Sequence, residues 1–347
     1  MFLSSIHRLV DTQVDWYGVG FDVQRVKNEC DGIIIPAANW LQSQKNSKGG
    51  LSELMAGLAR LVEAADLPTV ITGLGAQSND GSIPDLPDTT LKLLKAVSSR
   101  CNTLSVRGTF SAEVLERHGI HNVTVTGCPS LLWHLSYPAR VNRTVVPLER
   151  ITLNATVPGS SVPLQPDSRM EMGQFIMREA LAHDWDFVLQ TETPFIYGMF
   201  QNIEPDTARF LSYVFGTEDL NAIRRYLRDR LRYFGSVGDW ISYSANRDLI
   251  IGTRLHGVIA GLLAGTPSIL VTHDTRTVEM GIQAGIPTIT AEALRARRHI
   301  DPEACLAEAD FMSFNKRQKV YFSDFIEFFD RNDVPHRLER QKMHSPT

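Results

Sequence analysis

The sequence predicts an α/β fold made of two Rossmann-like domains. Short β-branched runs alternate with segments of helical apolar spacing along most of the chain. This alternation stops in a polar stretch with two prolines, residues 137–150, and then starts again. Strands that alternate with helices are typical of parallel sheets covered on both faces. Two such series indicate two domains, residues 1–140 and 150–347, facing a cleft.

The first series contains four expected strands and two expected helices. Strands are expected at 31–40, 67–78, 102–108 and 122–130, and helices at 89–100 and 109–119. The strand at 31–40 ends at a proline, and the one at 67–78 breaks into a glycine loop. In the helix at 109–119, Thr109 is the expected N-cap and Gly119 the expected stop.

The second series has the same pattern. Strands are expected at 151–159, 185–192, 248–252, 267–272 and 286–290. Helices are expected at 168–184, 206–215, 219–232 and 238–247, after each of the strands at 248–252 and 267–272, and in the tail at 301–333. The second domain therefore carries C-terminal helices beyond its last strand.

Composition excludes several classes of protein. Of 347 residues, 43% are hydrophobic and 21% charged, which is typical of a folded chain. The net charge of −4 gives no basic excess for nucleic acid or an anionic membrane surface. No signal peptide and no apolar run of about 18 residues is present, so we expect a cytoplasmic protein without a transmembrane segment. The cysteines and histidines form no metal-binding spacing, so no bound metal is predicted.

One stretch, "GTRLHGVIAGLLAGTPSILVTHDTRT" (252–277), carries the strongest functional signal. Thr253 is placed to cap the apolar helix that follows, which puts Arg254 and His256 in its first turn. A cation there disfavours the helix by roughly 0.3–1 kcal/mol unless an anion lies opposite. An anionic ligand at the start of the helix would supply that partner.

A second polar group follows the next strand, at His273, Asp274 and Arg276. Adjacent parallel strands of a right-handed unit end at the same edge of the sheet, where open α/β sheets bind ligands. We therefore expect these residues to converge with Arg254 and His256 on one crevice. The alternative is a buried Arg–Asp pair with structural histidines.

The first half has matching features. Arg107 follows a strand and precedes a helix, which places another guanidinium beside a helix start. Its alternative is an ion pair with Glu113 or Asp31. The loop "GLGAQ" offers Gly73 for close backbone approach and Gln77 as a donor, and its alternative is an ordinary turn.

Three segments resemble the polysaccharide pyruvyl transferase family. They are "LPTVITGLGAQS" (67–78), "SVRGTFSAEVLERHGIHNVTVTGCPSLLW" (105–133) and "DLIIGTRLHGVIAGLLAGTPSILVTHDTRTVEM" (248–280), and the resemblance runs over about residues 30–290. It implies a GT-B-like fold and transfer of a pyruvyl group from phosphoenolpyruvate to two hydroxyls of a sugar, giving a cyclic ketal. By resemblance, Arg254, Leu255 and His256 fall on the donor-binding turn, and Arg107 on the arginine of the first domain.

Donor chemistry fits these residues. Phosphoenolpyruvate carries a carboxylate and a phosphate, and guanidinium groups bind both well. We expect Arg254 and Arg107 to clamp the donor and His256 to act as general acid. No cofactor is expected besides this donor substrate. Weaker candidates for acceptor binding or for orienting the site are Thr253, Leu255, Gly73, Gln77, Asn39, His273, Asp274, Arg276 and Glu279.

The acceptor side is assigned to the N-terminal domain and the phosphoenolpyruvate side to the C-terminal domain. The first strand departs from the family pattern, since Pro36 to Asn39 stand where glycines are expected. Asn39 can still donate to a hydroxyl. The sequence leaves open the acceptor sugar, its hydroxyl pair, the ketal stereochemistry and whether the acceptor is lipid-linked, which would bring the protein to the inner membrane face. A homo-oligomer is compatible with it.

Two other functions remain. A GT-B glycosyltransferase that uses a nucleotide sugar would also place cations at this edge of the sheet, for a diphosphate. A non-catalytic binding protein that keeps the donor site and has lost the acceptor site would explain the altered turn at Pro36 to Asn39.

Overall fold

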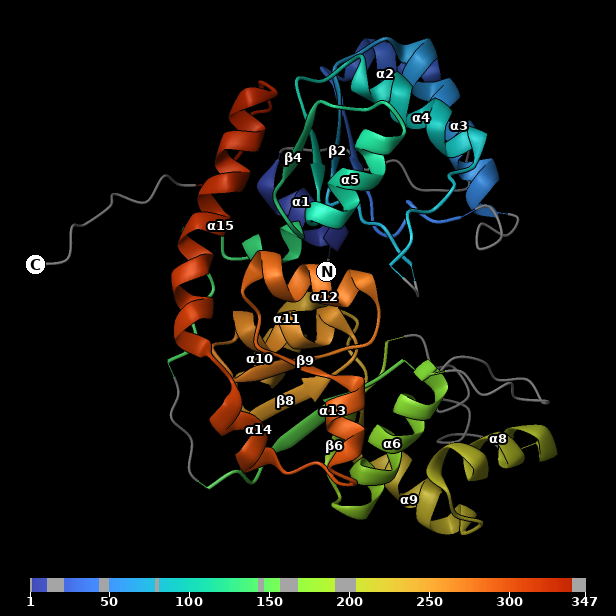
Figure 1. Ribbon diagram of the computed structural model, residues 1–347, viewed down its shortest axis with the longest axis vertical. Coiled ribbons are helices and arrows are strands. Elements are labelled where there is room, and N and C mark those ends of the chain that lie inside the picture. Colours follow the sequence, from blue (N-terminus) through green and yellow to red (C-terminus); the bar gives the residue numbers. More distant parts are fainter. Residues whose placement is uncertain are drawn as a thin grey trace, which may run out of the picture. The chain divides into compact units, whose positions relative to one another are not determined.

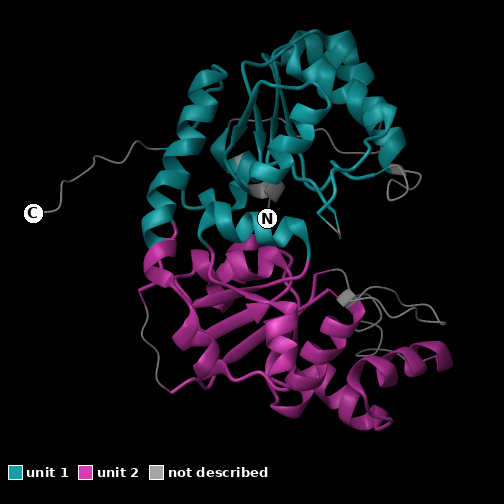
Figure 2. Ribbon diagram, in the orientation of Figure 1, with its two compact units in different colours: residues 1–138, 274–285, 315–347 teal, residues 139–273, 286–314 magenta. Residues whose placement is uncertain are grey.

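The chain forms two compact units, each built on parallel strands (Figures 1 and 2). A computed structural model describes residues 2–10, 22–43, 50–78, 81–142, 147–156, 168–190 and 204–338. Unit 1 comprises residues 1–138, 274–285 and 315–347, and unit 2 comprises residues 139–273 and 286–314. The predicted α/β class with parallel sheets is confirmed.

The units differ from the two continuous ranges expected from the sequence. The first boundary, at 138/139, falls inside the expected linker, but residues 274–285 and 315–347 group with unit 1. Their contacts explain this. Ser78 O accepts from Thr275 Oγ1 at 3.1 Å, and Tyr321 donates to Cys128 O at 2.9 Å. Long-range contacts of this kind leave no periodic signal in a sequence.

Unit 1 has four parallel strands in the order of the chain. They are β1 (Ile33–Pro36), β2 (Thr69–Thr72), β3 (Leu104–Val106) and β4 (Val123–Val125). A parallel bridge between Leu74 and Val106 joins the pair β1–β2 to the pair β3–β4. The four expected strands of the first half are therefore confirmed.

Helices connect these strands and supply the core of unit 1. They are α1 (Phe2–Leu9), α2 (Val23–Glu29), α3 (Gly50–Ala65), α4 (Asp88–Ser98), α5 (Thr109–Arg117), the short 3-10 helix η1 (Pro129–Leu132), α12 (Thr275–Ala284) and most of α15 (Phe311–Arg331). Met55 of α3 and Leu93 of α4 are fully buried against Ile71 of β2. Helices α1, α2 and α3 were not among the expected elements.

Unit 2 holds a six-stranded parallel sheet. Its strands are β5 (Ile151–Asn154), β6 (Asp186–Val188), β7 (Leu231–Arg232), β8 (Leu249–Gly252), β9 (Ser268–Thr272) and β10 (Thr288–Thr290). They lie in the order β7-β6-β5-β8-β9-β10. Numbered from the first strand of the unit, this is the 3-2-1-4-5-6 order of a Rossmann sheet. The prediction of a Rossmann-like domain is thus confirmed for this unit by its topology.

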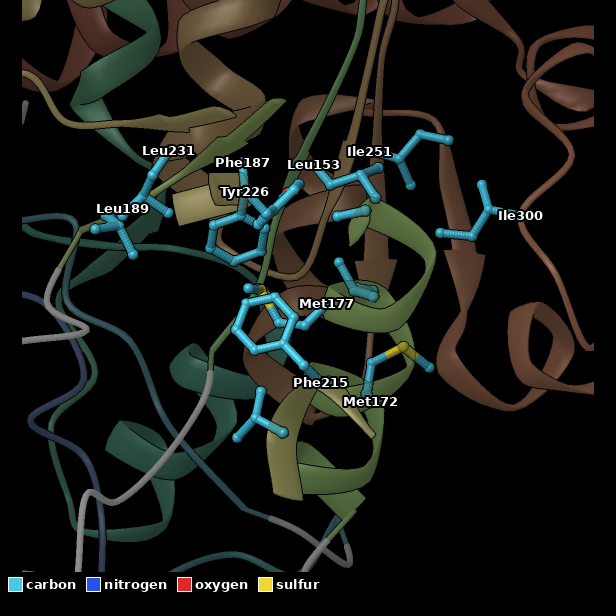
Figure 3. Close-up of a cluster of buried hydrophobic side chains, with 14 of the residues drawn as sticks. Leu153, Met172, Met177, Phe187, Leu189, Phe215, Tyr226, Leu231, Ile251 and Ile300 are labelled. Atoms are coloured by element: carbon cyan, nitrogen blue, oxygen red, sulfur yellow. The ribbon is translucent and has the colours of Figure 1, made fainter. Parts of the chain in front are cut away.

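Helices cover both faces of this sheet. They are α6 (Ser168–Ala182), α8 (Pro205–Phe215), α9 (Leu220–Arg230), α10 (Val237–Ser244), α11 (Leu255–Leu263), α13 (Ala291–Ala296) and α14 (Pro302–Glu308). Figure 3 shows the core on one face, where Leu153 and Phe187 meet Met177 of α6 and Tyr226 of α9.

Along the central strands, alternate side chains point to opposite faces of the sheet. Leu153 packs into the core with α6, whereas Thr152 bonds Tyr243 of α10 at 3.0 Å between the two hydroxyl oxygens. By the period of two in a strand, Asn154 points to the side of Thr152. The last residue of β5 is thus a buried amide on the face covered by α10 and α11.

Sequence and structure differ in detail at four places. The expected helix at 219–232 ends at Arg230, and its last two residues form strand β7. The helical tail breaks into α14 and α15. The expected segments at 151–159 and 185–192 run past the described residues, and their described parts contain β5 and β6. Thr109 is the first residue of α5, not its N-cap, which is Gly108 without a side-chain bond.

Candidate functional site

The strand order of unit 2 reverses between β5 and β8. These two strands pair in parallel, with Asn154 level with Gly252 at their carboxyl ends. From β5 the chain builds outward to β6 and β7, and from β8 it builds the other way to β9 and β10. Open α/β sheets bind ligands in the crevice at such a reversal point. The predicted donor turn, Arg254 to His256, follows β8 after the single residue Thr253.

Asn154 organises this turn. Its main-chain oxygen accepts from the Thr253 amide at 3.0 Å, and its side-chain Oδ1 accepts from the Arg254 amide at 2.9 Å. Thr253 in turn accepts the amide of Thr156 on its hydroxyl oxygen at 2.9 Å. Three hydrogen bonds therefore connect the end of β5 and the segment after it to the residues that follow β8.

The start of α11 differs from the prediction by one position. Arg254, not Thr253, is the N-cap residue, with extended backbone and no side-chain cap. The Thr253 hydroxyl serves Thr156 instead. Arg254 consequently stands just before the first turn, and Leu255 and His256 lie within it.

Exposure changes sharply along this segment. Arg254, Leu255 and His256 are half-buried, whereas α11 is buried throughout from Gly257 onward. An α-helix begins with amide groups that have no helical acceptor, and its dipole favours negative charge there. A guanidinium, an imidazole and a helix N-terminus thus share one partly exposed end of a buried helix. This combination suits an anion.

Asp274 and Arg276 form a local structure of their own. Asp274 is the N-cap of α12, and its Oδ1 accepts from the amide of Thr277 at 2.8 Å in a capping box. Its Oδ2 lies 3.2 Å from Nη2 of Arg276. Of the alternative weighed from the sequence, a buried Arg–Asp pair with structural histidines, the ion pair is present, with the Arg276 side chain 25% exposed. His273, the last residue before the boundary between the units, has Nδ1 at 3.4 Å from Val271 O.

In unit 1, the structure brings three predicted residues together. Arg107 is 3% exposed, and its Nε donates to Gly73 O at 2.8 Å while Nη1 donates to Asn39 Oδ1 at 3.2 Å. Gly73 has a φ of 65°, which favours glycine. Gly75 is required as well, because a Cβ there would lie 2.9 Å from Arg107 Cδ. Gln77 is half-buried, and its main-chain N–H donates to Leu41 O at 3.0 Å.

Glu279 of α12 takes over the role of cap for α5. Its Oε1 accepts from the Ser111 amide at 2.7 Å, and its Oε2 accepts from the Ser111 hydroxyl at 2.8 Å. Burial raises the pKa of Glu279, and this outweighs the lowering by Ser111 and by the charge on Arg107. Both oxygens of the carboxylate are thus engaged within unit 1.

The most informative residue that the sequence analysis missed is Asn154. It is fully buried, and only its place at the end of the β5 run "ITLN" could have revealed it. In the described ranges, no three His, Cys, Asp or Glu side chains gather as metal ligands, and no helix is long and apolar enough to cross a bilayer. That the protein uses no metal stays a prediction.

Known proteins resemble this chain at different levels. Among solved structures, a UDP-N-acetylglucosamine 2-epimerase aligns over 99% of this chain and 86% of its own, at 13% identity and a TM-score of 0.46. The Anabaena protein HepE in complex with UDP and glucose covers 90% and 78%, at 13% identity and a TM-score of 0.45. The glycosyltransferase SnogD from Streptomyces nogalater covers 88% and 71%, at 14% identity and a TM-score of 0.35.

No curated protein matches the sequence. The family model described as polysaccharide pyruvyl transferase, in contrast, matches residues 4–275, well over half of the chain. This range includes the Arg107 region, the β5–β8 reversal point and the turn at Arg254 and His256. The chain belongs to the polysaccharide pyruvyl transferase family.

Proposed function

We propose that this protein transfers the pyruvyl group of phosphoenolpyruvate to two hydroxyls of a sugar in a polysaccharide or glycan precursor, forming a cyclic ketal. The observation that carries this proposal is the turn at Arg254 and His256. It lies at the reversal point of a Rossmann sheet, at the start of a buried helix, inside the segment that matches the family.

The donor side of the proposal follows from charge. Phosphoenolpyruvate is a compact anion with a phosphate at one end and a carboxylate at the other. Arg254 supplies a guanidinium with a planar set of donors, which bonds either group in pairs. The N-terminus of α11 adds backbone amides and the positive end of the dipole.

The reaction needs a proton at carbon before it needs a nucleophile. Protonation of the C3 methylene turns it into a methyl group and leaves C2 cationic. One sugar hydroxyl then adds to C2 and loses its proton, the C2–O bond to phosphate breaks, and the second hydroxyl closes the ring. One hydroxyl proton replaces the proton delivered to carbon, and the other leaves with phosphate.

His256 is the proposed acid for the first of these steps. An imidazole is the side chain whose unperturbed pKa lies nearest neutral pH, so it can both deliver a proton and recover it from a hydroxyl. The proposal keeps Arg107 as a second donor clamp, by resemblance, and Asn39 as an acceptor ligand, because its amide can donate to a hydroxyl. Asp274 and Glu279 are given orienting roles because their oxygens are engaged within unit 1.

The first test is donor binding, measured as thermal stabilisation by phosphoenolpyruvate. A ligand at 100 times its Kd stabilises the fold by about 2.7 kcal/mol. We expect this shift in the wild type and its loss in Arg254→Ala. Arg228→Ala, which removes an exposed arginine of α9, should keep it. Stabilisation by UDP but not by phosphoenolpyruvate would instead favour the nucleotide-sugar glycosyltransferase.

Turnover is tested by phosphate release from phosphoenolpyruvate in the presence of candidate sugars. His256→Ala should bind the donor and lose roughly 10²–10⁴-fold in rate, which is the usual contribution of a positioned acid. Donor binding in the wild type without release by any acceptor would indicate the non-catalytic member of the family.

A further inference from the structure

Asn154 is an unusual residue for the place it occupies. It ends β5, one of the two central strands of the unit 2 sheet, and it is fully buried next to Gly257 of α11. Apart from Thr152, the other residues of β5 and β8 are apolar or glycine. An apolar side chain would fill this position without the cost of burying an amide. The choice of asparagine therefore needs an explanation.

The surroundings of Asn154 are shaped to admit it. A Cβ on Gly252 would lie 2.3 Å from Asn154 Cγ, and a Cβ on Gly257 would lie 2.6 Å from Asn154 Nδ2. Neither glycine has a positive φ, so glycine is needed at these positions for space and not for its backbone conformation. Two glycines, one at the end of β8 and one in the first turn of α11, thus leave room for a single side chain of β5.

The amide makes a specific contact with only one of its two ends. Oδ1 accepts from the Arg254 amide at 2.9 Å, which fixes which end of the side chain is oxygen. Nδ2 is shielded from solvent and has no hydrogen-bond partner in the parts of the chain that the structure describes. A buried donor without an acceptor is tolerated where function requires it.

We propose that Asn154 is a positioning residue for the anionic donor. Its main-chain oxygen and its Oδ1 hold the turn by accepting the amides of Thr253 and Arg254. Its Nδ2 places an uncharged hydrogen-bond donor next to Gly257, in the first turn of α11. The inference rests on the proposed function, since it takes phosphoenolpyruvate as the anion at this turn. Asn154 acts on the donor through Arg254 and the first turn of α11, and it is not a catalytic residue.

The decisive variant is Asn154→Asp, which has the same shape. It keeps an oxygen for the Arg254 amide and replaces only the NH₂ group by a second oxygen. At about pH 8, where the carboxyl is ionised, its charge opposes an anion at the same turn. We expect Kd for phosphoenolpyruvate, measured by calorimetry, to rise at least about tenfold over the wild type.

Lowering the pH should reverse this loss, and a merely structural defect would not behave so. Protonation of the carboxyl removes the charge, so the ratio of variant Kd to wild-type Kd should shrink as the pH falls from about 8 to about 5.5. In Asn154→Ala, which has no group to protonate, the ratio should stay high across this range. This second variant also carries the test if Asn154→Asp does not fold.

Thr152→Val is the matched control. Thr152 lies two residues earlier on β5, faces the same side and is also buried. Among the described residues its side chain hydrogen-bonds to Tyr243. Its loss should lower the melting temperature and leave the Kd for phosphoenolpyruvate unchanged. Wild-type affinity in Asn154→Asp at about pH 8, or an equal loss of affinity in Thr152→Val, would overturn the inference.

The same experiment separates this inference from the proposed function. If phosphoenolpyruvate binds the wild type and Asn154→Asp equally, the inference fails and the proposed function stands. If the wild type binds UDP and not phosphoenolpyruvate, the proposed function fails, and the same Kd comparison with UDP decides the inference. If neither binds, both are overturned.

Discussion

Glu279 shows how one side chain can decide the identity of another residue far away in the sequence. A Cβ on Gly108 would lie 2.0 Å from Glu279 Cγ, so this position tolerates only glycine next to the glutamate. The same glutamate caps α5 through Ser111 and lies within the electrostatic reach of Arg107. One carboxylate therefore fixes the start of the helix that follows Arg107.

Glu279 should make stability depend on pH in a defined direction. Burial raises its pKa in the folded state above the ordinary value of 4.5. Below 4.5 the group is protonated in both states. As the pH rises from there, the unfolded chain loses the proton first, so the free energy of unfolding falls until the folded pKa is passed.

Glu279→Gln should remove this dependence, because an amide keeps an oxygen for the Ser111 amide and does not titrate. Urea denaturation of both proteins at several pH values above 4.5 checks it. We expect the wild type to lose stability relative to the variant as the pH rises. If the free energies of unfolding of the two proteins changed with pH in parallel, or if the wild type became more stable relative to Glu279→Gln, the raised pKa of Glu279 would not be the cause.

At the scale of single residues, the charged candidates could be picked out from the sequence, but the residue that hydrogen-bonds to the turn at Arg254 could not. Arg254 and His256 stand out because a cation before an apolar helix is unfavourable without an anion. Arg107 stands out in the same way. Asn154 does not, because one polar residue at the end of a strand run has many ordinary explanations. Its importance depends on β5 lying next to β8, about a hundred residues later in the chain.

Helix α12 owes its start to a capping box at Asp274. The carboxylate accepts the Thr277 amide and hydroxyl, both at 2.8 Å, while Thr277 bonds back to the cap residue. Since removal of such a cap usually costs about 0.5–2 kcal/mol, Asp274→Ala should lower the free energy of unfolding by that amount. Chemical denaturation measures it.

Asp274→Asn separates the cap from the ion pair with Arg276. It keeps the oxygen for Thr277 and gives up only the charge, so it should recover most of the lost stability. A full loss in the asparagine variant would assign the stability to the ion pair instead. The Kd for phosphoenolpyruvate of both variants shows whether Asp274 also takes part in binding, which the sequence left as a candidate role.

Helices and strands were predictable where the apolar pattern was long or where glycine, proline or polar residues clearly marked its ends. Strands β8 and β9 were predicted because "DLIIG" and "PSILVT" each hold a short run of apolar residues between clear breaks. Strand β7 was missed because its two residues continue a helical pattern. The caps of α5 and α11 were misplaced because residues far away in the sequence intervene. Glu279 bonds the Ser111 amide in the first turn of α5, and the Thr253 hydroxyl accepts the Thr156 amide instead of capping α11.

At the scale of the whole molecule, the sequence predicted two units and the approximate first boundary, but not the later returns of the chain. The cleft expected between the two domains stays a prediction. The segments 274–285 and 315–347 group with unit 1 through long-range contacts, one of which is the 3.1 Å hydrogen bond from Asn332 Nδ2 to Thr103 O. No composition shift marks them.

A fragment of residues 1–140, the domain expected from the sequence, should therefore not fold as unit 1 does. It lacks α12 and α15, which cap α5 through Glu279 and bury Tyr321 against Cys128. We expect no cooperative thermal transition by circular dichroism, while the full chain shows one. A fragment that melts cooperatively would show that residues 1–140 are sufficient for a stable core.

The division of unit 1 also has a consequence in time. During synthesis the strands β1 to β4 leave the ribosome first, and domains usually fold in that order. Here the hydrogen bond from Asn332 to Thr103 O cannot form until Asn332, 229 residues later in the chain, has been synthesised. Unit 2, whose last segment ends at residue 314, has all of its residues available before unit 1 does. The first part of the chain to be made belongs to the last unit to be completed.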